Sequence, residues 1–289
     1  MNTSEKLIPR LTADGSFTFF SDEFREFFHS NYGARQEAEL KFVEPTRLVH
    51  KAAQPSLKLL DVCYGLGYNT AAALETIWRV NPECQVQLIA LEFDPFVPRA
   101  AIAHGLLHSW SKRVQRRLTR LATHGSVSTE DLEAQLLLGD ARQTIQQVYE
   151  RGFRAAAIFL DPFSPPHCPQ LWTVEFLGRL SFCLQAQGRL ATYSCAAAVR
   201  TALLEAGLQI GATPPVGRRS PGTVASNSPL DLSPLSQQER EHLQTRAAVP
   251  YRDPGLQDSP EVILHHRRIE QQNSILEPTA AWKRRWFLP

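Results

Sequence analysis

Short apolar runs alternate with longer amphipathic segments through the middle of the chain. Five runs have the length and composition of buried strands: LKLLDVC, VQLIALEF, AQLLLGD, AAAIFLD and RLATYSC. The segments with helical patterns are TAAALETIWRV, ARQTIQQVYERG, LWTVEFLGRLSFCLQAQG and AAAVRTALLEAG. Strands that alternate with helices are typical of βαβ units. The pattern therefore predicts an α/β, Rossmann-like fold with a mostly parallel, doubly wound sheet and helices on both faces.

The flanks of this pattern divide the chain. Residues 1–50 read as an N-terminal lead-in, with a strand at GSFTFF and then a short amphipathic helix and a polar turn. Residues 51–226 hold the sheet domain, and GTVAS near its end predicts a late antiparallel strand. Residues 227–289 read as a helical C-terminal extension packed on that domain. Its second helix is expected to begin with Ser259 as N-cap and Pro260 at the first helical position.

Composition narrows the class of protein. With 289 residues, 43% hydrophobic and 21% charged, the chain resembles an ordinary globular protein. It has no apolar run long enough for a membrane helix and no N-terminal signal core, so we expect a cytoplasmic protein without a membrane partner. The five cysteines form no C-x-x-C pair, which predicts neither disulfides nor a metal site. The oligomeric state is left open, and a monomer is compatible with the sequence.

The basic charge is mostly arginine and lies in clusters. SKRVQRRLTR places four arginines on one face of a predicted helix, and VGRRS, HHRR and WKRRW add further clusters. Arginine suits phosphate because its planar fork donates two parallel hydrogen bonds. One interpretation is an RNA-binding surface, and the alternative is a set of solvated helix faces. The RNA-binding candidates are Arg113, Arg116, Arg117, Arg120, Arg218 and Arg219.

A glycine loop and two acids suggest a nucleoside pocket. In LDVCYGLGYNT a strand runs into Gly65-x-Gly67 and then a helix, but Thr70 stands where a dinucleotide fingerprint has its third glycine. Glu92 ends the second strand, where an acid binds ribose hydroxyls. Asp140 ends the third strand and is placed to accept from an adenine amino group, with the Ala141 N–H beside it. This layout predicts a pocket for S-adenosylmethionine.

Asp94 is a second acid near the end of the second strand. It precedes Pro95 and so could serve only to cap the next helix. It therefore competes with Glu92 for the role of ribose ligand.

The stretch LDPFSPPHCPQLWT follows the fourth strand and is too rich in proline for helix or paired strand. Asp-Pro-Phe-Ser resembles the acid/amide-Pro-x-aromatic motif of amino-methyltransferases. Asp161 is suited to hold an amine, and Phe163 can stack on a planar base. The alternative for Asp161 is a cap at the end of the strand.

The same stretch resembles the LDGFAPxxNPxxWT segment of MnmC-type tRNA methyltransferases. Other segments of that family resemble four further stretches of this chain, so that the likeness spans about residues 15–225. These stretches are CYGLGYNT, LGDARQTI, SCAAAVRTALLEAGL and SDEFREFFHSNYGARQEAEL. The resemblance implies methylation, from S-adenosylmethionine, of the 5-aminomethyl group of the wobble (2-thio)uridine in tRNA. It also implies the stand-alone form, since the chain is too short for the flavin-binding oxidase domain.

The predicted substrate side comprises the catalytic Asp161 with Phe163, Ser164, Pro165 and Trp172. The predicted cofactor side comprises Tyr64, Gly65, Gly67, Asn69, Glu92, Asp140, Ala141 and again Asp161. Two positions depart from the family motif: Pro162 replaces a glycine and Cys168 replaces an asparagine.

Two alternatives stay open. A polyamine aminopropyltransferase-like enzyme would want a GGGDG-type loop in place of CYGLGY, and a non-catalytic RNA-binding protein would keep only a vestigial pocket.

Overall fold

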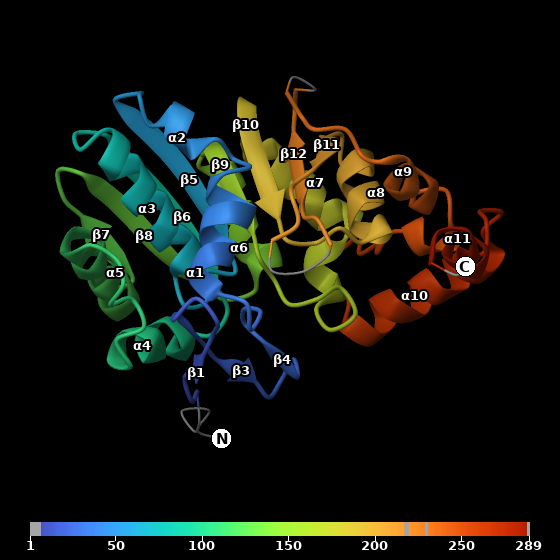
Figure 1. Cartoon of the computed structure of the whole chain (residues 1–289), viewed down its shortest axis with the longest axis horizontal. Helices are drawn as coiled ribbons and strands as arrows, with labels where there is room; N and C mark the ends of the chain where they lie inside the picture. The colour runs from blue at the N-terminus through green and yellow to red at the C-terminus, as the bar shows by residue number, and fades with distance from the viewer. Residues whose placement is uncertain (1–6, 217–219, 229–230, 288–289) are drawn as a thin grey trace.

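The computed structural model describes residues 7–216, 220–228 and 231–287. Its middle layer is an eight-stranded sheet with the order β11-β12-β10-β9-β5-β6-β8-β7 (Figure 1). The five central strands are parallel: β5 (Ser56–Val62), β6 (Gln85–Glu92), β8 (Leu132–Leu138), β9 (Ala155–Leu160) and β10 (Leu184–Thr192). The predicted α/β fold with a mostly parallel sheet is confirmed.

Antiparallel strands close both edges of the sheet. β7 (Ser126–Ser128) pairs with β8 at one edge. At the other edge β12 (Thr223–Ser226) lies between β10 and β11 (Gln209–Ala212), antiparallel to both. The late antiparallel strand predicted at GTVAS is confirmed.

Helices cover both faces, and each face has its own buried core. On one face lie α1 (Ala34–Glu37), a π-helix (Ala38–Val43), α2 (Leu48–Lys51), α3 (Tyr68–Val80), α4 (Phe96–Ala103) and α5 (Lys112–His124). On the other face lie α6 (Ala141–Glu150), a 3-10 helix (Pro169–Trp172), α7 (Val174–Phe182) and α8 (Ala197–Glu205). The apolar stripe of each helix packs on the sheet, which gives the three-layer architecture.

One predicted boundary was wrong. The helix expected over 171–188 ends at Phe182, and LQAQG forms the first half of β10. The reason lies at Gly188, where a Cβ would sit 2.8 Å from the carbonyl oxygen of Ala155 on β9. The glycine thus permits close strand packing, at the point where the β10–β9 register shifts, and does not end a helix.

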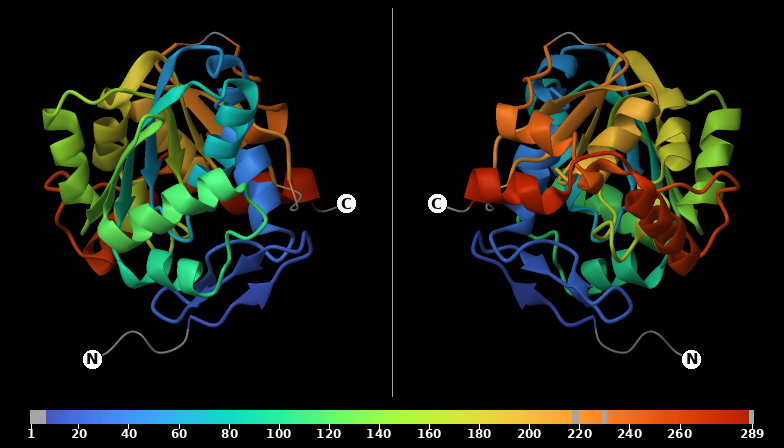
Figure 2. Two further views of the ribbon diagram at one scale, coloured as in Figure 1. Left: turned by 90° about the vertical axis from the view of Figure 1, so that its left-hand side faces the viewer. Right: turned by 90° about the vertical axis from the view of Figure 1, so that its right-hand side faces the viewer.

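The N-terminal lead-in forms two small hairpins beside the carboxyl ends of the parallel strands (Figures 1 and 2). β1 (Arg10–Leu11) pairs with β2 (Phe17–Thr18), and β3 (Phe20–Ser21) pairs with β4 (Glu26–Phe27). The strand expected at GSFTFF is therefore split between two hairpins. Part of DEFREFF, expected to belong to a helix or turn, supplies β4.

The C-terminal segment lies beyond the β11 edge of the sheet (Figure 1). It contains α9 (Gln237–His242), a 3-10 helix (Arg246–Ala248), α10 (Pro260–Asn273) and α11 (Thr279–Phe287). Ser259 is the N-cap residue of α10, but its hydroxyl bonds to Glu261 and makes no cap hydrogen bond. The helix expected over LSQQEREHLQTRA is only six residues long. None of the helices in the described ranges is both long and apolar enough to span a bilayer.

Candidate active site

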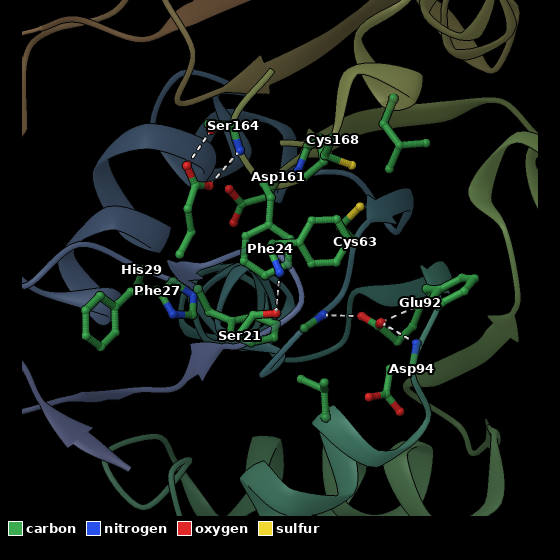
Figure 3. Close-up of a pocket in the computed structure, with 18 of the residues that line it drawn as sticks. Ser21, Phe24, Phe27, His29, Cys63, Glu92, Asp94, Asp161, Ser164 and Cys168 are labelled. Carbon is green, nitrogen blue, oxygen red and sulfur yellow. Dashed lines mark hydrogen bonds between the residues drawn. The ribbon is translucent and has the colours of Figure 1, made fainter. Parts of the chain in front are cut away.

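A cavity of about 520 Å³ opens at the carboxyl ends of the central strands, where the N-terminal hairpin β3–β4 covers them (Figure 3). The chain runs from β5 through β6 to β8 on one side and then returns to β9 on the other side of β5. Ligands of open α/β sheets bind at such a switch in strand order. The cavity therefore lies where the fold alone favours a site.

The walls of the cavity are acidic. Seven carboxyl groups line it, and the described lining residues include no lysine or arginine. Burial lowers the pKa of His29, which also lines the cavity, to about 4, so this imidazole is neutral. The seven are Glu23, Glu26, Glu37, Glu92, Asp94, Asp140 and Asp161. Two of these acids pair with cations behind the wall, Asp140 with Arg142 and Glu37 with Lys41, and the other five favour a cationic ligand.

The glycine loop is shaped from beneath by a buried tyrosine. Gly65 and Gly67 have φ of 54° and 83°, a backbone region that favours glycine. A Cβ on residue 67 would lie 2.5 Å from the hydroxyl oxygen of Tyr64. Of these three residues only Gly65 lines the cavity. The structure thus gives Gly67 and Tyr64 a role in the shape of the loop, and their assignment as cofactor-binding residues stays a prediction.

Glu92 is held at the end of β6 by three backbone N–H groups (Figure 3). Gly65 donates to Oε2 at 2.7 Å, while Phe93 and Asp94 donate to Oε1 at 2.7 and 2.8 Å. Burial raises the pKa of this carboxyl group. Asp94, in turn, precedes Pro95, the N-cap residue of α4, and accepts from the N–H of Phe96 at 2.8 Å. Glu92 is therefore the acid that is rigidly aimed at the cavity.

Asp140 and Ala141 lie together at the start of α6 and line the cavity. Asp140 caps the helix by accepting from the N–H of Arg142 at 2.9 Å. Both of its carboxyl oxygens also accept from the Arg142 guanidinium, at 2.7–3.2 Å. The N–H of Ala141 is the first of the helix and has no partner within it. The sequence predicted Asp140 and Ala141 at this site but did not predict the ion pair between Asp140 and Arg142.

Asp161 follows β9 and points into the same cavity (Figure 3). Asn69, on the first turn of α3, donates its amide to Oδ2 at 2.8 Å. Burial raises the pKa of Asp161 well above its ordinary value, and the nearby Glu37 and Asp61 raise it further. Asn69 itself is buried and does not line the cavity. Asn69 thus holds Asp161 in place, and its assignment to the cofactor stays a prediction.

The proline loop presents one aromatic face to the cavity. Phe163 lies parallel to Phe24 of the lead-in, with ring centroids 4.3 Å apart and planes 13° apart. Trp172 is fully buried behind the loop and donates its indole N–H to the carbonyl of Phe163 at 2.9 Å. Pro165 is also buried and does not line the cavity. Trp172 therefore supports Phe163 from behind the loop, and the assignment of Trp172 and Pro165 to the substrate stays a prediction.

Ser164 joins this loop to the N-terminal hairpin. Its N–H donates to Glu26 Oε2 at 2.9 Å, its hydroxyl bonds to Glu26 Oε1, and His167 lies 3.2 Å from Oε1. The polar groups of Ser164 are thus engaged by the protein itself, although the residue lines the cavity. Sequence reasoning missed Phe24, Glu26 and Glu37. The available signal was the density of aromatic residues in FTFFSDEFREFF.

The two departures from the family motif also lie at this loop. Cys168 lines the cavity, and burial raises its thiol pKa to about 12, so the group is neutral. The carbonyl of Pro162 accepts from the hydroxyl of Tyr193 at 2.9 Å.

The predicted arginine face on α5 divides into two pairs. Arg113 and Arg117 form ion pairs with Asp131 at 2.8 and 2.9 Å. Arg116 and Arg120 are exposed and line a shallow groove along the helix. Arg218 and Arg219 lie outside the described residues.

These residues fit the cofactor predicted from the sequence. Glu92, the unpaired N–H of Ala141 and the acidic walls suit a nucleoside that carries a positive charge. The described ranges contain no group of three or more His, Cys, Asp or Glu side chains arranged for a metal ion.

Comparisons with known proteins agree with this chemistry. A family profile described as S-adenosyl-L-methionine-dependent methyltransferase matches residues 98–228. The crystal structure of MnmC2 from Aquifex aeolicus superposes with a TM-score of 0.81 and 33% sequence identity, covering 93% of this chain and 87% of that one.

Two curated relatives are 29% identical to this chain. An uncharacterized protein, MJ0670 of Methanocaldococcus jannaschii, matches over 90% of this chain and 71% of its own length. The tRNA 5-methylaminomethyl-2-thiouridine biosynthesis bifunctional protein MnmC of Ralstonia nicotianae matches over 75% of this chain and 34% of its own. The match thus spans about a third of the bifunctional relative.

Proposed function

Because this chain belongs to the MnmC-type family of S-adenosylmethionine-dependent methyltransferases, we propose that it N-methylates the wobble uridine of tRNA. The acceptor is the primary amine of 5-aminomethyl(-2-thio)uridine, and the product is the 5-methylaminomethyl form. The observation that carries this proposal is Asp161, a buried carboxyl group beside an aromatic wall in an acidic cavity.

The acidic cavity supports an amine as the acceptor. A primary aminomethyl group is cationic near neutral pH, and the carboxyl-lined walls attract it. The amine must lose a proton before its lone pair can attack a methyl group. The cavity therefore has to bind the cation and accept its proton.

We assign that proton to Asp161. Asn69 fixes Oδ2 and so leaves Oδ1 to accept an N–H of the substrate. Because burial raises the pKa of Asp161, its carboxylate is a stronger base than a carboxylate in water. The stiff proline loop keeps Asp161 in place, so that the amine is oriented as it is deprotonated.

We assign the cofactor to the residues at the ends of β6 and β8. Glu92 would accept from the ribose hydroxyls, and Asp140 and the Ala141 N–H would hold the adenine. S-adenosylmethionine, when bound, supplies the electrophilic methyl group.

The aromatic wall supports a nucleobase as the body of the substrate. Phe163 on the proline loop and Phe24 on the hairpin already stack on one another, with ring centroids 4.3 Å apart, so a base would stack on an outer face of this pair. Bases of single-stranded RNA bind by stacking on such rings. A polyamine would use the same acidic walls but would gain little from two phenyl rings. The wall therefore favours a base-linked amine over the aminopropyltransferase-like alternative.

Transfer of a labelled methyl group from S-adenosylmethionine tests the acceptor, and transfer of a labelled aminopropyl group from decarboxylated S-adenosylmethionine to a polyamine tests the alternative. Three acceptors are compared: tRNA with the 5-aminomethyl group, the same tRNA without it, and spermidine. We expect label only in the first tRNA. Label in spermidine but in neither tRNA would refute the substrate assignment. Titration with S-adenosylhomocysteine by calorimetry separates the third alternative, because a vestigial pocket would not bind it.

A further inference from the structure

A chain of three charged residues, which ends at a fully buried carboxyl group, connects the cavity to the C-terminal segment. Asp253 is 0% exposed, and its Oδ2 lies 2.8 Å from Nη1 of Arg142. The same guanidinium holds Asp140, which lines the cavity. Only one arginine therefore separates the C-terminal segment from the residue that we assign to adenine.

Asp253 is itself firmly held. Its Oδ1 accepts from the N–H groups of Gln257 and Asp258 at 3.1 and 3.2 Å. Its own N–H donates to Glu175 of α7 at 2.8 Å. Arg142 also donates to the carbonyl of Asp258 at 2.9 Å. The turn at 253–258 is thus pinned to α6 and α7, and it fixes the position of the guanidinium.

The charges in this group are unequal. Two carboxylates share one guanidinium, so the three residues together carry one negative charge. Without Asp253, Arg142 would be neutralised by Asp140 alone, and Asp140 would become a weaker acceptor. The guanidinium would also lose one of the three groups that hold it, which are Asp140, Asp253 and the carbonyl of Asp258.

We propose that Asp253 is a positioning residue of the cofactor site. Through Arg142, it sets the orientation and the free negative charge of Asp140, which accepts a hydrogen bond from the 6-amino group of adenine. This inference rests on the assignment of Asp140 to adenine and is independent of the tRNA substrate. It makes the C-terminal segment a functional part of the methyltransferase.

The test is the binding of two product analogues to the full chain by calorimetry. S-adenosylhomocysteine carries the 6-amino group, and S-inosylhomocysteine has an oxygen in its place. Asp253→Asn is nearly isosteric and keeps an oxygen for Gln257 and Asp258, but it removes the acceptor for Arg142. The control is Arg252→Ala, which removes the exposed ion pairs of Arg252 with Glu205 and Glu270 in the same segment.

We expect wild type to prefer the adenosyl ligand. Asp253→Asn should bind that ligand about 3- to 10-fold more weakly, the loss of part of one hydrogen bond. The affinity of this variant for S-inosylhomocysteine should change less. The ratio of its affinities for the adenosyl and inosyl ligands should therefore be smaller than that of wild type. The control should behave as wild type. If Asp253→Asn does not fold, Arg142→Lys, which keeps the charge without the fork, carries the same expectation.

Three results would overturn the inference. They are an unchanged affinity of the variant, an equal loss for both ligands, or a wild type that does not distinguish the ligands. Because no tRNA is present, none of these results bears on the acceptor. Failure of the tRNA proposal, conversely, would leave the binding comparison intact.

Discussion

Asp161 is the residue on which the chemistry depends. Exchange to asparagine keeps its size and its contact with Asn69 but removes the proton acceptor. We expect Asp161→Asn to lower kcat at least about 100-fold, a usual range for loss of a general base. The affinity for S-adenosylhomocysteine should change less than about 3-fold, since the residue contributes little to ribose or adenine contacts. Single-turnover kinetics and calorimetry measure the two quantities.

The matched variant is Glu92→Gln, which should weaken binding of S-adenosylhomocysteine because Glu92 is assigned to the ribose. If Asp161→Asn lost as much affinity as Glu92→Gln, the division of roles between the two acids would be refuted.

Asp61 is a second buried carboxyl group, and it governs stability. Burial raises its pKa from 3.8 to about 7, although Thr70 donates to Oδ2 at 2.6 Å. Between these two values the folded protein retains the proton and the unfolded chain has lost it, so raising the pH favours unfolding. We expect Asp61→Asn to gain up to about 4 kcal/mol in free energy of unfolding relative to wild type between about pH 4 and about pH 8.

Urea denaturation of the ligand-free proteins measures this difference. A difference that stayed constant over the same pH range would show that Asp61 is not the titrating group.

The sequence predicted which residues belong to the site better than it predicted the direction of their side chains. Glu92, Asp140 and Asp161 reach the cavity because a parallel sheet brings the carboxyl ends of its strands to one edge. Trp172 lies in the same motif and faces away. A motif marks positions along the chain, and a proline-rich loop has no periodicity from which the facing of a side chain could be read.

At the scale of elements, the N-terminal hairpin shows what local patterns miss. β3 and β4 have two residues each, too few for an alternating pattern. The hairpin owes its position to Glu26, whose partner Ser164 is 138 residues further along the chain. The five parallel strands were predictable because each is a continuous apolar run, whereas a contact at that separation leaves no local signal.

The hairpin also carries the second aromatic ring of the proposed base site. We expect Phe24→Ala to raise the KM for tRNA about 5- to 100-fold, the range for loss of one stacking contact. Binding of S-adenosylhomocysteine should be unchanged. Initial rates at varied tRNA concentration give the KM.

Phe20 provides the control. It belongs to the same hairpin and packs on Phe27 with ring centroids 5.0 Å apart, but it does not line the cavity. Equal effects of Phe20→Ala and Phe24→Ala would indicate a general loss of hairpin structure in place of a base contact.

At the scale of the whole molecule, RNA must be held by surfaces outside the cavity, since its walls are acidic. The exposed Arg116 and Arg120 on α5 are the available pair, because Arg113 and Arg117 are bound to Asp131. We expect Arg116→Glu with Arg120→Glu to weaken tRNA binding and to reduce the slope of log affinity against log salt by about 2. Filter binding at several salt concentrations gives both values.

Arg151→Glu is a suitable comparison, because Arg151 is exposed at the end of α6 on the opposite face of the sheet. If it weakened binding as much as the α5 variant, the effect would reflect net charge and not a docking surface.

The central claim is the identity of the methyl acceptor, and the nucleoside composition of tRNA after reaction tests it most directly. Purified protein, S-adenosylmethionine and tRNA bearing the 5-aminomethyl group are combined, and the tRNA is digested and analysed by mass spectrometry. We predict that the 5-aminomethyl nucleoside is converted to its 5-methylaminomethyl form by wild type and not by Asp161→Asn. An unchanged wobble nucleoside, in a preparation that binds S-adenosylhomocysteine and methylates another acceptor, would contradict the account.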